Sequence, residues 1–213
     1  MTKGQQILED YIKFPLYILT HPIQGYRQFK EEKKGKTSVG LFYLAMMILA
    51  SIFEYKYTGP VVAMYDQTKF SSISIIVYTI VPVVVLAVAN WSITTLLDGK
   101  GKMKEIFLMG CYSFFPVVFT TFLCVILSNV VTENEVGFLN LLYIVATFLQ
   151  GYLIFMGLVV LHEYGIGKTL ATVFLTVIAT MVIMFIALLI FDLSQQIYGF
   201  LYSLYYEISM RFF

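Results

Sequence analysis

The sequence predicts an all-α polytopic membrane protein, a bundle of five transmembrane helices with an amphipathic interfacial helix at each terminus. Of its 213 residues, 59% are hydrophobic and 13% are charged, whereas a soluble globular domain carries about 25% charged residues. The mean hydropathy is +0.82. The apolar runs leave little of the chain to build a soluble domain, so we expect one membrane domain over residues 37–191.

Residues 1–36 are expected to form a basic, amphipathic, cytoplasmic segment. Two stretches separated by His21 place apolar side chains at helical spacing, and Pro22 suits the first turn of the second helix. Such helices lie in the membrane interface and are attracted to anionic lipid. The apolar positions are Ile7, Leu8, Tyr11, Ile12, Pro15, Leu16, Ile23, Tyr26 and Phe29. The cations expected to contact lipid or a partner are Arg27, Lys30, Lys33 and Lys34.

Five uncharged runs have the length of transmembrane helices. None of them contains Asp, Glu, Lys, Arg or His. Each is at or near the roughly 17–25 residues that cross the hydrocarbon core. The first run is the shortest, and it is expected either to extend through Glu54 or to thin the bilayer. Pro82 and Pro116 are expected to kink the second and third runs, because each removes a backbone hydrogen bond. The runs cover residues 37–53, 71–97, 106–131, 138–161 and 169–191.

Lys and Arg are divided unequally between the two sides of this predicted bundle. Of the 14 in the chain, eleven fall on the side of the N-terminus and three on the other. The first side holds Lys3, Lys13, Arg27, Lys30, Lys33, Lys34, Lys36, Lys100, Lys102, Lys104 and Lys168, and the second holds Lys56, Lys69 and Arg211. Cytoplasmic loops carry the excess of positive charge. The N-terminus is therefore predicted to be cytoplasmic and, with an odd number of spans, the C-terminus outside.

The polar side chains within the spans have two interpretations. The first is packing, because such groups commonly form hydrogen bonds between membrane helices; Asn90, Tyr112, Pro116 and Gln150 are the positions of interest. The second is a path for a neutral or lipidic solute, with Asn90, Thr94, Tyr112 and Gln150 as contacts. Ion-coupled transporters and intramembrane proteases need ionisable side chains at membrane depth. We therefore expect no enzyme activity.

Two short motifs after the fourth run resemble catalytic or nucleotide-binding sequences. His162-Glu163 resembles the start of a zinc-protease helix, but the second His is missing. With two histidines in the chain, no His-rich metal site can be built. The run from Gly165 to Lys168 resembles a phosphate-binding loop, whose first Gly is replaced by His162. Both motifs are interpreted as a cytoplasmic loop, with no metal or cofactor.

The connection between the second and third runs is a basic loop. Gly99 and Gly101 are expected to permit a tight reversal. The lysines there, Lys100, Lys102 and Lys104, are candidates for contact with phosphate headgroups or an acidic partner.

Residues 192–213 repeat apolar side chains at helical spacing, with Tyr198 and Tyr202 as candidate contacts. This segment is expected to lie on the outer surface, extend the fifth span, or dock on a partner, and the pattern does not choose between these alternatives.

Early in the third run stands the stretch Gly110-Cys111-Tyr112-Ser113-Phe114-Phe115-Pro116. Together with the five spans and the Gly/Lys-rich loop between the second and third runs, this stretch resembles the Yip domain family of Ypt/Rab-interacting membrane proteins, whose third span carries a Gly-Tyr-x-x-x-Pro-like signature. Here Cys111 is inserted between the Gly and the Tyr. The long polar tail of eukaryotic members is absent, so the resemblance implies a bacterial plasma-membrane member.

The resemblance implies a non-enzymatic scaffold or accessory subunit that binds other membrane proteins, including the permease subunits of solute importers. A transporter or channel for a neutral or lipidic solute, and a protein that shapes membranes, are the alternatives. The expected partners are membrane lipids, other integral membrane proteins and a second copy of the chain, and not nucleic acid.

Overall fold

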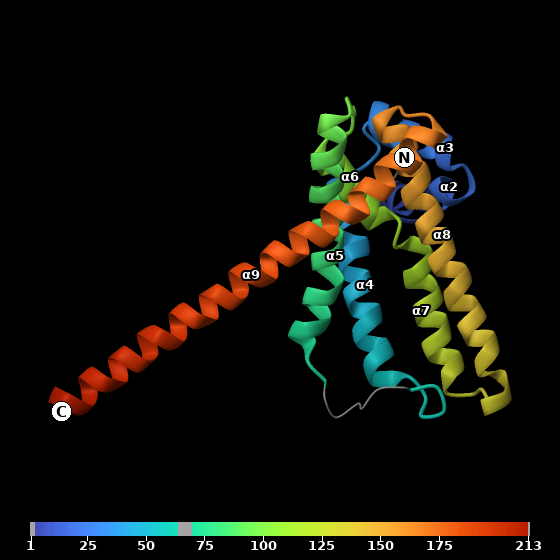
Figure 1. Ribbon diagram of the computed structural model, residues 1–213. Coiled ribbons are helices and arrows are strands. Elements are labelled where there is room, and N and C mark those ends of the chain that lie inside the picture. Colours follow the sequence, from blue (N-terminus) through green and yellow to red (C-terminus); the bar gives the residue numbers. More distant parts are fainter. Residues whose placement is uncertain (1–2, 64–69, 213) are drawn as a thin grey trace.

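The computed structural model describes residues 3–63 and 70–212, and every regular element in those ranges is a helix (Figure 1). Five segments are long and apolar enough to cross a membrane, which confirms the predicted fold class. Lys69 lies outside the described residues. The membrane helices are α4 (Thr37–Tyr57), α5 (Ser72–Leu96), α6 (Met103–Tyr112) joined end to end with α7 (Phe115–Ser128), α8 (Val136–His162) with the short turn η3 (Glu133–Glu135) before it, and α9 (Ile166–Phe212).

Three short helices and a π-helical turn precede the bundle and cover one of its ends (Figure 1). They are α1 (Lys3–Leu8), the turn η1 (Glu9–Lys13), α2 (Phe14–Thr20) and α3 (Pro22–Glu31). The chain reverses at His21, and Pro22 occupies the first turn of α3 as expected. A side chain at Gly25 would place its Cβ 2.8 Å from the Cα of Ile18. The absence of a side chain at Gly25 therefore lets α2 and α3 pack in close contact.

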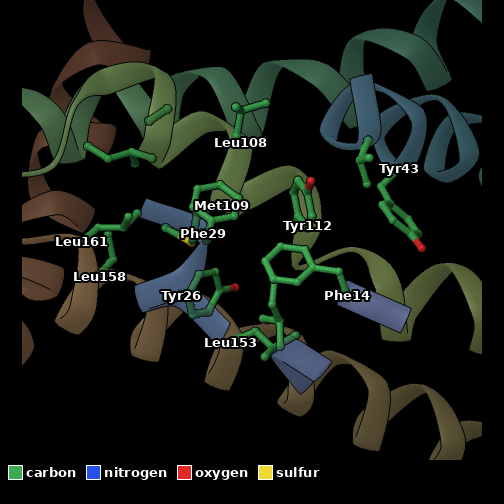
Figure 2. Packing of buried hydrophobic residues seen from close by; sticks show 14 residues of the cluster. Phe14, Tyr26, Phe29, Tyr43, Leu108, Met109, Tyr112, Leu153, Leu158 and Leu161 are labelled. Atoms are coloured by element: carbon green, nitrogen blue, oxygen red, sulfur yellow. The ribbon is translucent and has the colours of Figure 1, made fainter. Parts of the chain in front are cut away.

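The apolar face of α3 packs into the bundle instead of facing lipid. Tyr26 and Phe29 are buried, together with Phe14 and Ile18 of α2. Figure 2 shows Tyr26, Phe29 and Phe14 among side chains of α6 and α8. The face of α1 and α2 that remains uncovered is also apolar, with Ile7, Leu8, Ile12 and Leu16 exposed. The N-terminal segment is thus amphipathic as predicted, but it buries one apolar side in protein and leaves another free for lipid.

The third span is broken in its middle. The helix stops at Tyr112 and restarts at Phe115, with Pro116 in the first turn of α7. Pro116 lacks the N–H that would have bonded to the carbonyl of Tyr112, four residues earlier. The hydroxyl of Ser113 instead donates to the carbonyl of Gly110 at 2.6 Å. The expected kink before Pro116 is therefore a short turn of two residues, Ser113 and Phe114, which keep right-handed helical dihedrals between the two helices.

Two features of the spans decide between alternatives that the sequence left open. The first span continues to Tyr57 and so includes Glu54, which is partly buried. The extension of the first span through Glu54 is therefore confirmed, and with it the span contains an ionisable side chain. The fifth span and the C-terminal segment form one continuous helix, α9, which leaves the bundle at a steep angle (Figure 1). Of the three alternatives for residues 192–213, the structure shows an extension of the fifth span.

Candidate functional site

The basic end of the bundle, formed by α3, the α5–α6 loop and the α8–α9 turn, brings several predicted cations together. Glu163 stands at its centre, directly after α8, in a left-handed conformation with a φ of 56°. Its carboxylate accepts from Lys30 Nζ at 3.0 Å and from Lys100 Nζ at 2.5 Å. These two hydrogen bonds lower the pKa of Glu163 from 4.5 to about 2. Glu163 thus joins α3 to the α5–α6 loop.

Beneath this ion pair lies a buried chain of polar groups that starts at His162. The backbone N–H of Gly101 donates to Nδ1 of His162 at 3.3 Å, so the proton of the neutral ring is on Nε2. Nε2 lies 3.1 Å from Oδ1 of Asn90, and Nδ2 of Asn90 donates to the hydroxyl of Thr176 at 3.0 Å. That hydroxyl donates to the carbonyl of Thr172. The chain connects α8, α5 and α9. His162 is therefore a buried helical residue, and its assignment to a loop is wrong.

The glycines of the α5–α6 loop make room for this histidine. A Cβ on Gly99 would lie 2.6 Å from His162 Nδ1, and one on Gly101 would lie 2.7 Å from His162 Cε1. Among the described residues no glycine has a positive φ, and the left-handed turn is made by Asp98 with a φ of 57°. The expectation that the glycines serve the reversal is therefore corrected: they allow close approach.

The end of α5 is held by two residues of the α8–α9 region. The carbonyl of Leu97 accepts from the hydroxyl of Tyr164 at 2.8 Å and from Lys168 Nζ at 2.7 Å. The Lys168 ammonium also lies 4.2 Å from the centre of the Tyr164 ring, a cation–π contact. Lys168 thus neutralises the negative end of the α5 dipole.

The remaining predicted cations divide into paired and unpaired ones. Lys34 forms an ion pair with Glu32 at 2.9 Å. Arg27, Lys33, Lys102 and Lys104 are exposed and have no acidic partner within the described ranges. These four are the cations that remain open to phosphate headgroups or to an acidic partner surface.

Tyr112 is the centre of the aromatic core below α3. Its hydroxyl accepts from the backbone N–H of Lys36 at 3.1 Å and donates to the Lys36 carbonyl at 3.2 Å. Its ring packs edge-on against Phe14 and Phe29, with centroids 6.3 and 5.2 Å apart. In Figure 2 the ring of Tyr112 lies close to that of Phe14, and Tyr43 lies on another side of it. Tyr112 therefore fixes the linker between α3 and α4.

The four intramembrane positions singled out in the sequence are not brought together. Asn90 belongs to the buried polar chain that starts at His162, and Tyr112 binds the α3–α4 linker. Pro116 lies in the first turn of α7. Gln150 lines a separate cavity between the helices. Thr94 is buried and donates to the carbonyl of Asn90. The structure thus gives packing roles to Asn90, Thr94 and Tyr112.

Tyr112 belongs to the Gly-Tyr-x-x-x-Pro-like stretch, and its hydroxyl connects that stretch to the backbone of Lys36. The family model that describes the Yip1 domain matches residues 16–205. The chain belongs to the Yip1 domain family. No curated protein and no solved structure matches it significantly. In this Yip1 member the two residues have separate structural roles, because Tyr112 holds the α3–α4 linker and Pro116 lies in the first turn of α7.

Sequence reasoning missed Thr176 and undervalued His162 and Glu163. The signal for Thr176 was present: Thr169, Thr172 and Thr176 recur at a spacing of three to four residues, which places them on one face of α9. All three are buried. Such a stripe predicts a polar contact with a neighbouring helix, but it does not identify Asn90 as the partner.

Proposed function

We propose that this protein is a non-enzymatic scaffold or accessory subunit that binds other integral membrane proteins, among them importer permeases, in a bacterial plasma membrane. In this proposal the N-terminus is cytoplasmic and the C-terminus outside. The cations of the basic end, including Arg27, Lys33, Lys102 and Lys104, face anionic lipid or an acidic partner. The distal half of α9 binds the membrane partner.

The observation that carries the proposal is the exposure of distal α9. Every side chain from residue 184 to residue 208 is exposed. With 47 residues, α9 is about 70 Å long, more than twice the roughly 30 Å of the hydrocarbon core. Because α9 leaves the bundle at a steep angle, the part past Asp192 lies away from the other helices, and its large apolar side chains are covered by none of the described residues. They include Leu193, Ile197, Phe200, Leu201, Leu204 and Ile208, each at least 43% exposed.

An apolar helix face of this size that no other helix of the described chain covers supports an interaction site on distal α9. The exposed rings of Tyr198 and Tyr202 stack with their centroids 6.5 Å apart and extend the surface on another side of the helix. Tyrosine is a residue type that often dominates binding energy at protein interfaces. Distal α9 thus offers both an apolar stripe and aromatic anchors.

Copurification in mild detergent, followed by mass spectrometry, tests this function. The full chain should bring the same membrane protein in repeated preparations. A Leu201→Glu, Leu204→Glu variant should lose that protein, whereas the control Gln195→Ala, Gln196→Ala should retain it. Both variants should be inserted in the membrane and monodisperse. A monodisperse full chain that reproducibly brings no partner would overturn the proposal.

A second candidate function is membrane shaping by the N-terminal helices. It is favoured by the exposed apolar face of α1 and α2, where Ile12 is 52% and Leu16 is 47% exposed. Amphipathic helices in the interface respond to curvature. The expected result is a change in vesicle curvature on reconstitution that Ile12→Glu and Leu16→Glu abolish. Vesicles of unchanged shape would exclude this function.

A further inference from the structure

A cavity of about 460 Å³ lies between α4, α5, α6 and α8, away from the basic end of the bundle. Its walls are mostly apolar, and Tyr78, which is 78% exposed, stands at its edge. The volume falls in the roughly 300–1,000 Å³ range of small-molecule sites. Polar side chains enter it at a few positions, which are Ser51, Glu54, Thr79, Ser113 and Gln150.

The irregular backbone of the bundle borders this cavity. Pro82, within α5, cannot donate to the carbonyl of Tyr78, and both residues line the cavity. Ser113 and Phe114, where the third span is interrupted, line it from another side. At membrane depth, irregular backbone is tolerated where it is buried in protein or lines a cavity. Two separate helix irregularities therefore converge on the same space.

Two polar side chains in the cavity indicate a ligand. Gln150 lies near the middle of α8, and its amide has no hydrogen-bond partner in the part of the chain that the structure describes. Glu54 lies one turn before the end of α4 and hydrogen-bonds with Tyr143 of α8. A carboxylate within a span is costly and marks a functional site by default. The cavity thus contains the amide of Gln150, which is available to a ligand, and the carboxyl group of Glu54 near the end of α4.

We propose that this cavity binds a single-chain lipid amphiphile whose head group is an amine. The amine binds Glu54, and a polar group farther along the ligand bonds with Gln150. Along α5 the lining runs from Ile75 to Leu86, about 16 Å, so the site holds a chain segment parallel to the membrane helices. This inference is independent of the partner proposed for α9.

The fifth helix of a second copy is a poorer occupant. Its apolar stretch over residues 181–191 contains no Ser, Thr, Asn, Gln or charged residue. This stretch would fill the apolar part of the cavity. It would leave the Gln150 amide without a hydrogen-bond partner in an apolar environment, which costs free energy of binding. An amphiphile satisfies both Gln150 and Glu54 while its chain contacts the apolar wall.

A photoactivatable, clickable sphingosine tests the proposal on the full-length protein in nanodiscs. Cross-links should map by mass spectrometry to α4, α5 and α8 around the cavity, and unlabelled sphingosine should compete. Glu54→Gln should lower labelling about tenfold, because a hydrogen bond with a charged group is lost, and Gln150→Leu should lower it as well. The matched controls Glu207→Gln and Gln195→Leu should leave it unchanged, and a photoactivatable palmitic acid should label the cavity weakly.

Three results would overturn the proposal. The first is labelling spread evenly over the lipid-facing helices, insensitive to unlabelled sphingosine. The second is labelling of the cavity that Glu54→Gln and Gln150→Leu both leave unchanged in folded, monodisperse protein. The third is a disulfide between Ser51→Cys in one copy and Met184→Cys in another, formed in native membranes as labelling disappears, which would show that a second copy fills the cavity.

Discussion

The Nε2 atom of His162 lies 3.1 Å from Oδ1 of Asn90, and both side chains are buried. The two residues are 72 positions apart in the chain and come from different membrane helices. His162 also accepts a hydrogen bond from the N–H of Gly101. The imidazole therefore connects the α5–α6 loop to the ends of α5 and α8. The basic end of the bundle is therefore held by a buried polar chain as well as by surface ion pairs.

Replacing Asn90 with Leu should destabilise the fold by about 1–3 kcal/mol, since His162 and Thr176 lose a buried hydrogen-bond partner. The measurement is the free energy of unfolding in mixed detergent micelles. Asn140→Leu, at an exposed position of α8, is the matched control and should have little effect. Equal stability of the two variants would show that the chain from His162 to Thr176 contributes nothing.

Gly99→Ala and Gly101→Ala should each destabilise the protein by about 1–3 kcal/mol, the usual cost of overpacking. In both, the new methyl group would stand less than 3 Å from the ring of His162. Gly165→Ala and Gly167→Ala, where a Cβ meets nothing within 4 Å, should be tolerated. If all four variants unfold alike, the histidine does not fill the space assigned to it.

Tyr112→Phe should cost about 1–2 kcal/mol, because its hydroxyl bonds with both backbone groups of Lys36. Tyr26→Phe is a matched control in the same core, because the hydroxyl of Tyr26 is buried without a hydrogen-bond partner among the described residues. Tyr26→Phe should therefore leave stability unchanged or raise it. Unfolding in mixed micelles measures both, and a larger loss for Tyr26→Phe would contradict the packing.

Acid should weaken the basic end through Glu163. Its pKa is lowered in the folded protein to about 2, so it binds fewer protons there than in the unfolded chain. Its stabilising effect is complete above about pH 4.5 and is lost as the pH falls towards 2. The difference in melting temperature between the wild type and Glu163→Gln should therefore shrink over that interval. A difference that is constant from pH 6 to pH 2 would exclude this role.

The spans could be predicted because uncharged runs of this length have few other structures available to them. Their ends were less certain: Glu54 and Lys56 made the first run appear to stop early, whereas α4 continues to Tyr57. Charged and polar side chains near a helix end can reach the interface, so charge is a poor marker of the last turn. A kink at Pro116 could be predicted because it depends on a missing N–H, whereas the end of α6 at Tyr112 could not.

Contacts between distant helices could not be predicted in the same way. Helical spacing shows that Tyr26 and Phe29 share a face, but lipid and a protein core attract the same side chains. The buried pairing of His162 with Asn90 is equally hidden, because neither residue has a neighbour in the sequence that identifies the other. The cavity was hidden for the same reason, since Glu54 of α4 and Gln150 of α8 line one space only after the whole bundle has assembled.

We propose above that distal α9 binds another membrane protein. Photocrosslinking amino acids placed at Tyr202 and Leu204 in living cells test it most directly, with Phe148, an exposed residue of α8, as the control position. A protein adduct of one defined mass is expected at Tyr202 and Leu204, and lipid adducts alone are expected at Phe148. Lipid adducts alone at all three positions would contradict it.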